Sequence, residues 1–181
     1  MNGVYIGIDP GKSGAITILY NDNSLKVMDI TDFYDNEGAA RISLNPLKLN
    51  DWIDYEFKDG LVPVLHVCCE EPVFMPGFTS HTTMSMFESF GVFRTLFLLR
   101  NISFSSVRPG TWIKSYPELY HPKKKRDKAE SVALAQKLFP THADIFERTI
   151  TRGRTKGNKV LLDGRAESTL IALYGKNSSG K

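Results

Sequence analysis

Acidic residues stand at four places along the chain, and each place is the beginning or the end of a predicted strand or helix. Asp9 ends a short apolar run and precedes a glycine turn. Glu70 and Glu71 end a second apolar run, and Asp163 and Glu167 stand at the start of the last predicted helix. Carboxylates at strand ends and at a helix start can converge on one point of a fold. Such a cluster repels itself unless it binds cations.

A converging set of carboxylates suits the hydrolysis of a phosphodiester. This reaction needs activated water near neutral pH and a stabiliser for the charge on the leaving oxygen, and two divalent ions about 3.5–4 Å apart provide both. Magnesium prefers oxygen ligands and keeps several waters, so three or four carboxylates are enough to hold it. Asp163 and Glu167 are four residues apart, which places both on one face of a helix. There they could hold two adjacent metals, or one metal and a base.

Two basic segments accompany the acidic residues and favour a nucleic acid as partner. The first segment contains His121, Lys123, Lys124, Lys125, Arg126 and Lys128. The second segment contains Arg148, Arg152, Arg154, Lys156, Lys159 and Arg165. Lys and Arg contacts with phosphates provide most of the sequence-independent affinity for nucleic acids. A pair of merely solvated loops is the alternative, and the carboxylate set beside the two segments weighs against it.

The composition is that of an ordinary soluble globular protein. The 181 residues are 41% hydrophobic and 24% charged, with a net charge of +3. No apolar run approaches the roughly 20 residues of a membrane span, and the N-terminus lacks a signal-peptide pattern. The only cysteines, Cys68 and Cys69, are adjacent, so we expect no disulfide framework and a reduced, cytoplasmic setting. We predict one domain at residues 1–175 and a disordered tail at 176–181.

The first part of the chain is predicted to form three antiparallel strands. They are Tyr5–Asp9, Ala15–Tyr20 and Leu25–Ile30, and turn residues too few for a crossover separate them. A helix at Pro46–Phe57 follows. A run of apolar and β-branched residues then predicts a buried strand at Val62–Cys69.

The second part is predicted to be mainly helical. Aromatic residues at helical spacing predict a helix at Thr82–Arg100, and a capping box begins another at Asp127–Phe139. Between these two helices we expect a strand and a short helix, and after them a mobile segment and a final helix. The ranges of these four segments are Ile102–Val107, Pro109–Ser115, 141–162 and Gly164–Tyr174.

Four motifs follow one another along the chain: Ile6-Gly7-Ile8-Asp9-Pro10-Gly11, Glu70-Glu71-Pro72-Val73-Phe74-Met75-Pro76-Gly77, Asp127-Lys128-Ala129-Glu130-Ser131-Val132-Ala133-Leu134-Ala135 and Asp163-Gly164-Arg165-Ala166-Glu167. In this order they resemble motifs of the RuvC family of Holliday junction resolvases, in particular its phage-type branch. The resemblance spans most of the chain. The order of elements is also that of the RNase H-like fold, an α/β fold with a mixed five-stranded sheet, its first three strands antiparallel, flanked by helices.

The resemblance implies a metal-dependent endonuclease, usually a homodimer, that nicks two strands of a four-way DNA junction symmetrically. It implies two magnesium ions per site, replaceable by manganese. Asp9 would bridge them, and Asp163 and Glu167 would complete the site. This last pair departs from cellular members, whose final acid is an aspartate three residues after the previous one. The metal preference and the role of Asp163 therefore stay open.

The glutamate that completes the ligand set is Glu70 or Glu71. The spacing to Met75-Pro76-Gly77 resembles phage-type relatives and favours Glu70, whereas alignment of Val73-Phe74 with cellular members favours Glu71. We take Glu70 as the catalytic residue and keep both as metal ligands.

Other residues match positions that support catalysis or contact DNA in the family. Lys128, at the start of its helix, matches a lysine that stabilises the developing charge. Phe74 matches an aromatic residue that can insert into the junction, and a core position is its alternative. The expected DNA-contacting residues are Lys12, Phe74, Lys114, Lys123, Lys124, Lys125, Arg126, Arg152, Arg154, Lys156 and Lys159.

Three other functions compete with junction resolution. A nuclease acting on flaps, forks and other branched DNA would use the same residues. A phosphotransferase of the sugar-kinase and actin superfamily shares the first motif but needs two such domains, so no nucleotide cofactor is expected. A non-catalytic protein that binds branched DNA is less favoured because every acidic position is filled. If the chain is phage-encoded, it would act in the host cytoplasm.

Overall fold

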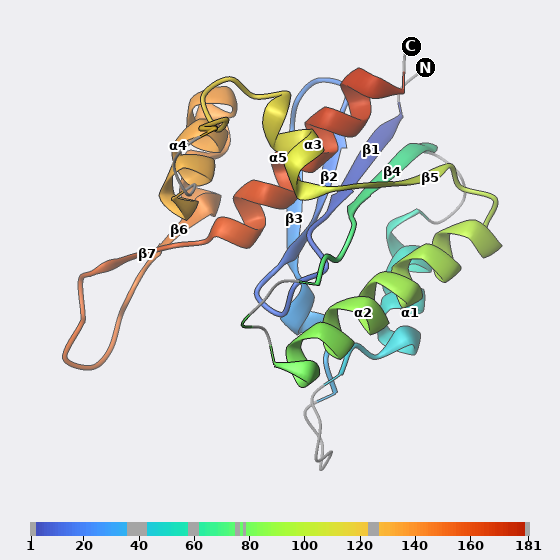
Figure 1. Ribbon diagram of the computed structural model, residues 1–181, viewed down its shortest axis with the longest axis horizontal. Coiled ribbons are helices and arrows are strands. Elements are labelled where there is room, and N and C mark those ends of the chain that lie inside the picture. Colours follow the sequence, from blue (N-terminus) through green and yellow to red (C-terminus); the bar gives the residue numbers. More distant parts are fainter. Residues whose placement is uncertain are drawn as a thin grey trace.

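A mixed sheet forms the centre of the molecule, with helices on both of its faces (Figure 1). The structure is a computed structural model and describes residues 3–35, 43–57, 62–74, 77, 79–122 and 127–179. The five strands have the order β3-β2-β1-β4-β5. They are β1 (Val4–Ile8), β2 (Ala15–Tyr20), β3 (Leu25–Asp29), β4 (Val64–Glu70) and β5 (Phe104–Val107).

The strand directions confirm the predicted fold class. β1, β2 and β3 pair in antiparallel fashion, whereas β4 is parallel to β1 and β5 is parallel to β4. In this register Ile8 is paired with Cys69, and Glu70 with Val107. The residues that follow β1 and those that end β4 therefore lie side by side at one edge of the sheet.

The helices begin at residues that suit helix starts. Pro46 is the first residue of the helix Pro46–Glu56. The Asn45 side chain accepts hydrogen bonds from the backbone N–H groups of Leu47 and Lys48, which have no partner within the helix. Asp127 and Glu130 form the predicted capping box. The helices are η1 (Ile30–Phe33), α1 (Pro46–Glu56), α2 (Ser80–Leu99), α3 (Pro109–Lys114), α4 (Lys128–Leu138), η3 (Pro140–Phe146) and α5 (Asp163–Ser178). None of those in the described part of the chain could cross a membrane.

Each face of the sheet has its own core. On one face, Ile6 and Ile8 of β1 pack with residues of α1 and α2, among them Phe93. On the other face, Cys68 of β4 packs with Leu170 of α5 and with residues of α3 and α4. Strand side chains alternate between faces, so residues two positions apart share a face. Asp9, two residues after Gly7, and Glu70, two residues after Cys68, therefore belong to this second face.

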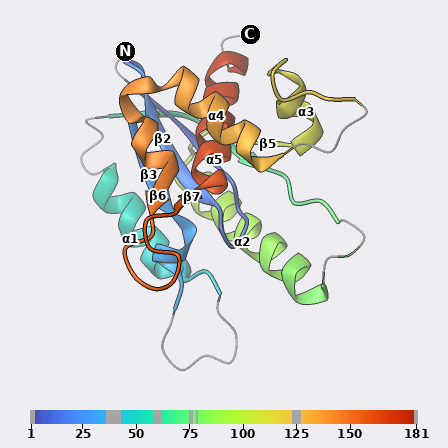
Figure 2. The ribbon, with the colours of Figure 1, turned by 90° about the vertical axis from the view of Figure 1, so that its left-hand side faces the viewer.

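Residues 147–161, within the segment that we expected to be mobile, form a β-hairpin. The hairpin consists of β6 (Glu147–Thr149) and β7 (Lys159–Leu161), and it extends away from the sheet in Figure 1 and faces the viewer in Figure 2. Its base is held by an ion pair of 2.5 Å between Lys159 and Glu147. Gly153 and Gly157 have positive φ and supply the turn.

The last helix is longer than predicted and includes residues 176–178, which we had assigned to a disordered tail. Two contacts hold its C-terminal end. A Cβ atom at Gly175 would lie 2.8 Å from Cβ of Cys68, so the helix still packs on the sheet there. The Lys176 ammonium donates to the Asn21 carbonyl and to the Asn23 side chain. Residues 180–181 lie outside the described part.

Candidate active site

Asp9 is held in place by a turn that only glycine permits. The Gly11 amide donates to Asp9 Oδ1 at 3.0 Å, and the Asp9 amide donates to the Ala15 carbonyl at 3.1 Å. A Cβ atom at Gly14 would lie 2.9 Å from the carboxyl carbon of Asp9, which real Cβ atoms essentially never do. The glycine turn therefore fixes the direction in which the Asp9 carboxylate points.

The beginning of α5 lies directly against this turn. A Cβ atom at Gly164 would clash with the backbone of Ser13 and Gly14, so glycine at this position allows the helix to approach the turn. The approach brings Asp163 and Glu167, which are one helical turn apart, toward Asp9. Glu167 is only 7% exposed, and the buried Ser131 hydroxyl of α4 donates to it at 3.3 Å.

The mutual repulsion of these carboxylates affects the pKa of Asp9. Burial first, and then the negative charge of Glu167, raise the pKa of Asp9 from 3.8 to about 7. Asp163 adds a smaller effect in the same direction. The Gly11 amide and the charge of Lys128 act against it. The three acids thus share one site, where a cation would relieve their repulsion.

Lys128 is a cation beside this site. It is the first residue of α4, and its ammonium forms a hydrogen-bonded ion pair with Asp163. Burial lowers the pKa of Lys128, but the hydrogen bond to Asp163 and the charges of Glu167 and Asp9 raise it overall. Lys128 therefore stays charged and faces all three acids.

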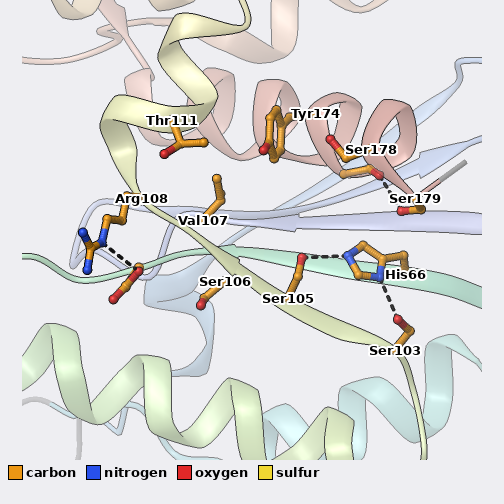
Figure 3. Close-up of a pocket in the computed structure, with 12 residues that line it drawn as sticks. His66, Ser103, Ser105, Ser106, Val107, Arg108, Thr111, Tyr174, Ser178 and Ser179 are labelled. Atoms are coloured by element: carbon orange, nitrogen blue, oxygen red, sulfur yellow. Dashed lines mark hydrogen bonds and ion pairs between the residues drawn. The ribbon is translucent and has the colours of Figure 1, made fainter. Parts of the chain in front are cut away.

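The two glutamates at the end of β4 have different surroundings. Strand alternation places Glu70 with Cys68 on the α5 face, which is also the face of Asp9. The buried Trp112 indole donates to Glu70 Oε1 at 2.8 Å. Glu71 instead pairs with Arg108 at 3.5 Å, and both residues line a separate groove of about 560 Å³. Figure 3 shows Arg108 at one end of this groove and His66 at the other. Glu70 is the glutamate that shares a face with Asp9.

Two solved structures of RuvC from Thermus thermophilus resemble this structure along nearly its whole length. RuvC in complex with a Holliday junction substrate has a TM-score of 0.53 at 12% identity, covering 94% of this chain and 90% of that chain. The other RuvC structure has a TM-score of 0.50 at 13% identity, covering 94% and 91%. The chain has the fold of RuvC. No protein-family model and no curated protein matches the sequence.

On this RuvC fold, the structure separates the predicted DNA-contacting residues into groups. Lys12 is exposed in the turn beside Asp9, and Arg152, Arg154 and Lys156 are exposed on the hairpin. Phe74 is 72% exposed, so its alternative as a core residue is wrong. The remaining residues are Lys114, whose ammonium lies 5.6 Å from the centre of the Tyr120 ring, Lys159 in its ion pair with Glu147, and residues 123–126, which lie outside the described part.

Sequence patterns missed the roles of Ser131 and Trp112, and they placed Arg165 in a basic segment without its partner Asp29. Ser131 contacts Glu167 and Trp112 contacts Glu70, and both side chains are buried. Arg165 makes two hydrogen bonds of 2.7 Å to Asp29, which fixes the first turn of α5 against β3. Sequence patterns indicate the roles of Trp112 and Ser131 only weakly, because both look like ordinary core residues.

The site offers suitable ligands for a divalent metal, but these ligands do not form a complete coordination shell. Within the described residues, no three acidic, histidine or cysteine side chains are gathered closely enough to hold a metal ion. Glu70 is turned to Trp112, and Asp163 to Lys128. The donor set nevertheless fits a hard cation, because Asp9, Asp163 and Glu167 provide only carboxylate oxygens that repel one another.

Stability of the metal-free protein is predicted to fall as the pH rises from about 4 to about 7. The folded protein holds the Asp9 proton up to about pH 7, whereas the unfolded chain releases it near 3.8. Between these values the folded state binds more protons, so a rise in pH favours unfolding. Thermal unfolding in EDTA at several pH values measures the loss. Asp9→Asn should remove part of it, and an identical pH profile for the variant would contradict the raised pKa.

Proposed function

We propose that the protein is a metal-dependent endonuclease that cleaves branched DNA, with the four-way junction as its main substrate. The observation that carries this proposal is the meeting of Asp9, Asp163 and Glu167 on a RuvC fold, with Glu70 on the same face of the sheet. One structural neighbour is RuvC bound to a Holliday junction substrate, which supports the choice of DNA. The likeness in the four motifs supports the phage-type branch.

Magnesium is the proposed cofactor, with manganese as a substitute and two ions per site. Asp9, Glu70, Asp163 and Glu167 would hold the ions, and Glu71 is less suited because it pairs with Arg108 beside a separate groove. Bound ions of this kind activate water and stabilise charge on the phosphate oxygens.

The chain's own residues prepare the site for this chemistry. Ser131 orients Glu167 and Trp112 orients Glu70, each through one hydrogen bond from a buried side chain. Lys128 neutralises Asp163 in the absence of substrate. In the presence of DNA, the same ammonium lies where it can stabilise the negative charge that develops on the phosphate.

The β6–β7 hairpin provides a surface for a DNA arm. All residues from 151 to 159 are exposed, and four of them are basic: Arg152, Arg154, Lys156 and Lys159. The base of the hairpin leads directly into α5, so its position relative to Asp163 is fixed. DNA held at the acidic site would therefore pass beside these cations.

Reversing the charge of Arg152 and Arg154 to glutamate should weaken junction binding about tenfold or more and reduce its salt dependence. Each lost phosphate contact lowers the slope of log K against log salt concentration by about 1. Binding titrations at several salt concentrations measure this slope. Lys137→Glu, on the exposed side of α4 in a pair with Glu118, is the control. An unchanged slope in the double variant would remove the hairpin tip from the DNA path.

A homodimer is the proposed assembly, because two symmetric nicks need two active sites. The outer side of α2 supports this proposal, since it leaves large apolar side chains without cover. Met84 is 58% exposed, Phe87 48% and Leu99 74%. A second copy of the chain that packs on this side would bury them.

The decisive experiment is cleavage of a labelled four-way junction in magnesium, alongside a fork, a flap and a linear duplex. Paired symmetric nicks confined to the junction are the expected result. Cleavage of every branched form would instead indicate a general debranching nuclease with the same site. Tight binding without cleavage in magnesium or manganese would overturn the catalytic assignment and favour a binding protein.

A further inference from the structure

A second groove, separate from the one in Figure 3, opens beside the acidic residues. It has a volume of about 420 Å³ and lies between the β1–β2 turn and the base of the β6–β7 hairpin. Ser13 and Thr31 line one side, Arg148 and Leu161 line the other, and Asp163 lies within its lining. The groove therefore connects a residue of the proposed catalytic set to the basic hairpin.

The walls of this groove are held together by backbone contacts. The Leu162 amide donates to the Phe146 carbonyl at 2.8 Å, which joins the hairpin base to the end of η3. The Ile30 amide donates to the Gly14 carbonyl at 3.1 Å, which holds η1 against the β1–β2 turn. Since Gly164 packs against the backbone of Ser13, the two walls also meet directly. The groove is thus a fixed part of the fold.

The charges in the groove leave one cation available. Arg165 is engaged by Asp29 through two hydrogen bonds, and Asp163 is engaged by Lys128. Arg148 is exposed and, within the described part of the chain, its side chain makes no hydrogen bond or ion pair. A guanidinium that has no polar partner among the described residues, and that shares a groove with two hydroxyl side chains, suits a phosphate diester, which accepts two parallel N–H bonds from arginine.

We propose that this groove binds the DNA phosphate next to the one that is cleaved, with Arg148 as its ion-pair partner and Ser13 and Thr31 as hydroxyl donors. This inference rests on the proposed nuclease function and extends it. A strand whose phosphate reacts beside Asp163 has to leave the acidic site in some direction. The groove provides a path for this DNA strand, which beyond the groove contacts the basic residues of the hairpin.

The test compares Arg148→Ala and Arg148→Lys with the wild type on a labelled four-way junction. Arg148→Ala should lower kcat/KM about tenfold, because a charge-assisted hydrogen bond is lost, and Arg148→Lys should recover part of it. Lys176→Ala is the control for the loss of a cation at the opposite end of α5, where Lys176 bonds to Asn21 and Asn23. Since the Arg148 side chain makes no hydrogen bond or ion pair within the described part of the chain, thermal unfolding of its variants should match the wild type.

A modified substrate separates a direct phosphate contact from a general charge effect. Junctions with one neutral methylphosphonate linkage on either side of the cleaved phosphate should lose about tenfold in kcat/KM with the wild type at one of the two positions. Arg148→Ala should be insensitive to that same linkage, as expected when both changes remove one interaction.

Two results would overturn the inference in distinguishable ways. If the wild type cleaves junctions but Arg148→Ala responds to every neutral linkage as the wild type does, the groove assignment is wrong and the nuclease function stands. If the wild type cleaves no DNA in magnesium or manganese, the proposed function fails and the groove assignment fails with it.

Discussion

Replacing Asp9 with asparagine should lower the rate of junction cleavage at least about 1,000-fold, which corresponds to about 4 kcal/mol in the activation barrier. Asparagine keeps the shape of the side chain and can still accept the Gly11 amide bond. It lacks the negative charge that the proposed metal binding needs. Binding of the junction should change little, because Asp9 is not a cation and makes no ionic contact with a phosphate.

Single-turnover cleavage in magnesium measures the loss, and binding in EDTA measures the retained affinity. Asp51→Asn is the matched control, since Asp51 is an exposed aspartate on α1, on the opposite face of the sheet. The metal-free Asp9→Asn protein should also be more stable than the wild type above pH 7, because it no longer carries a buried charge beside Glu167. Full cleavage activity in this variant would overturn the site assignment.

The placement of the acidic residues at strand ends and at a helix start was predictable because its signals are local. Asp9 stands at the end of an apolar run, and Asp163 and Glu167 have helical spacing, so each position could be placed on its element from a few neighbours. The choice between Glu70 and Glu71 needed more, since it depends on which face of the sheet each side chain takes. Only the packing of Cys68 against α5 fixes that face.

The residues that orient the acids were not predictable, because their contacts join distant parts of the chain. Trp112 and Glu70 are 42 residues apart, Ser131 and Glu167 are 36 apart, and Arg165 and Asp29 are 136 apart. The hairpin was missed for a different reason. Its glycines and exposed cations are typical of a mobile loop, and the short strands that hold it contain only three residues each.

Replacing Gly7 with alanine should have the largest effect on folding. Helix α5 crosses β1 at this residue, and a Cβ atom there would lie under 3.0 Å from backbone atoms of both Ser168 and Ala172. Backbone atoms cannot move aside as a side chain can, so the whole helix must shift. That shift would break the buried hydrogen bonds between the Thr17 hydroxyl and those of Ser168 and Thr169, at 2.7 and 3.0 Å.

We expect Gly7→Ala to lower the free energy of unfolding by about 3 kcal/mol or more, measured by urea denaturation. Gly91→Ala is the matched control, because Gly91 lies inside α2 with nothing within 4 Å of its Cβ position. There alanine should raise stability by up to about 1 kcal/mol. The residue before Ser168 is Glu167, so the displaced helix should also lose cleavage activity. Equal stability of the Gly7 and Gly91 variants would mean that α5 does not approach β1 this closely.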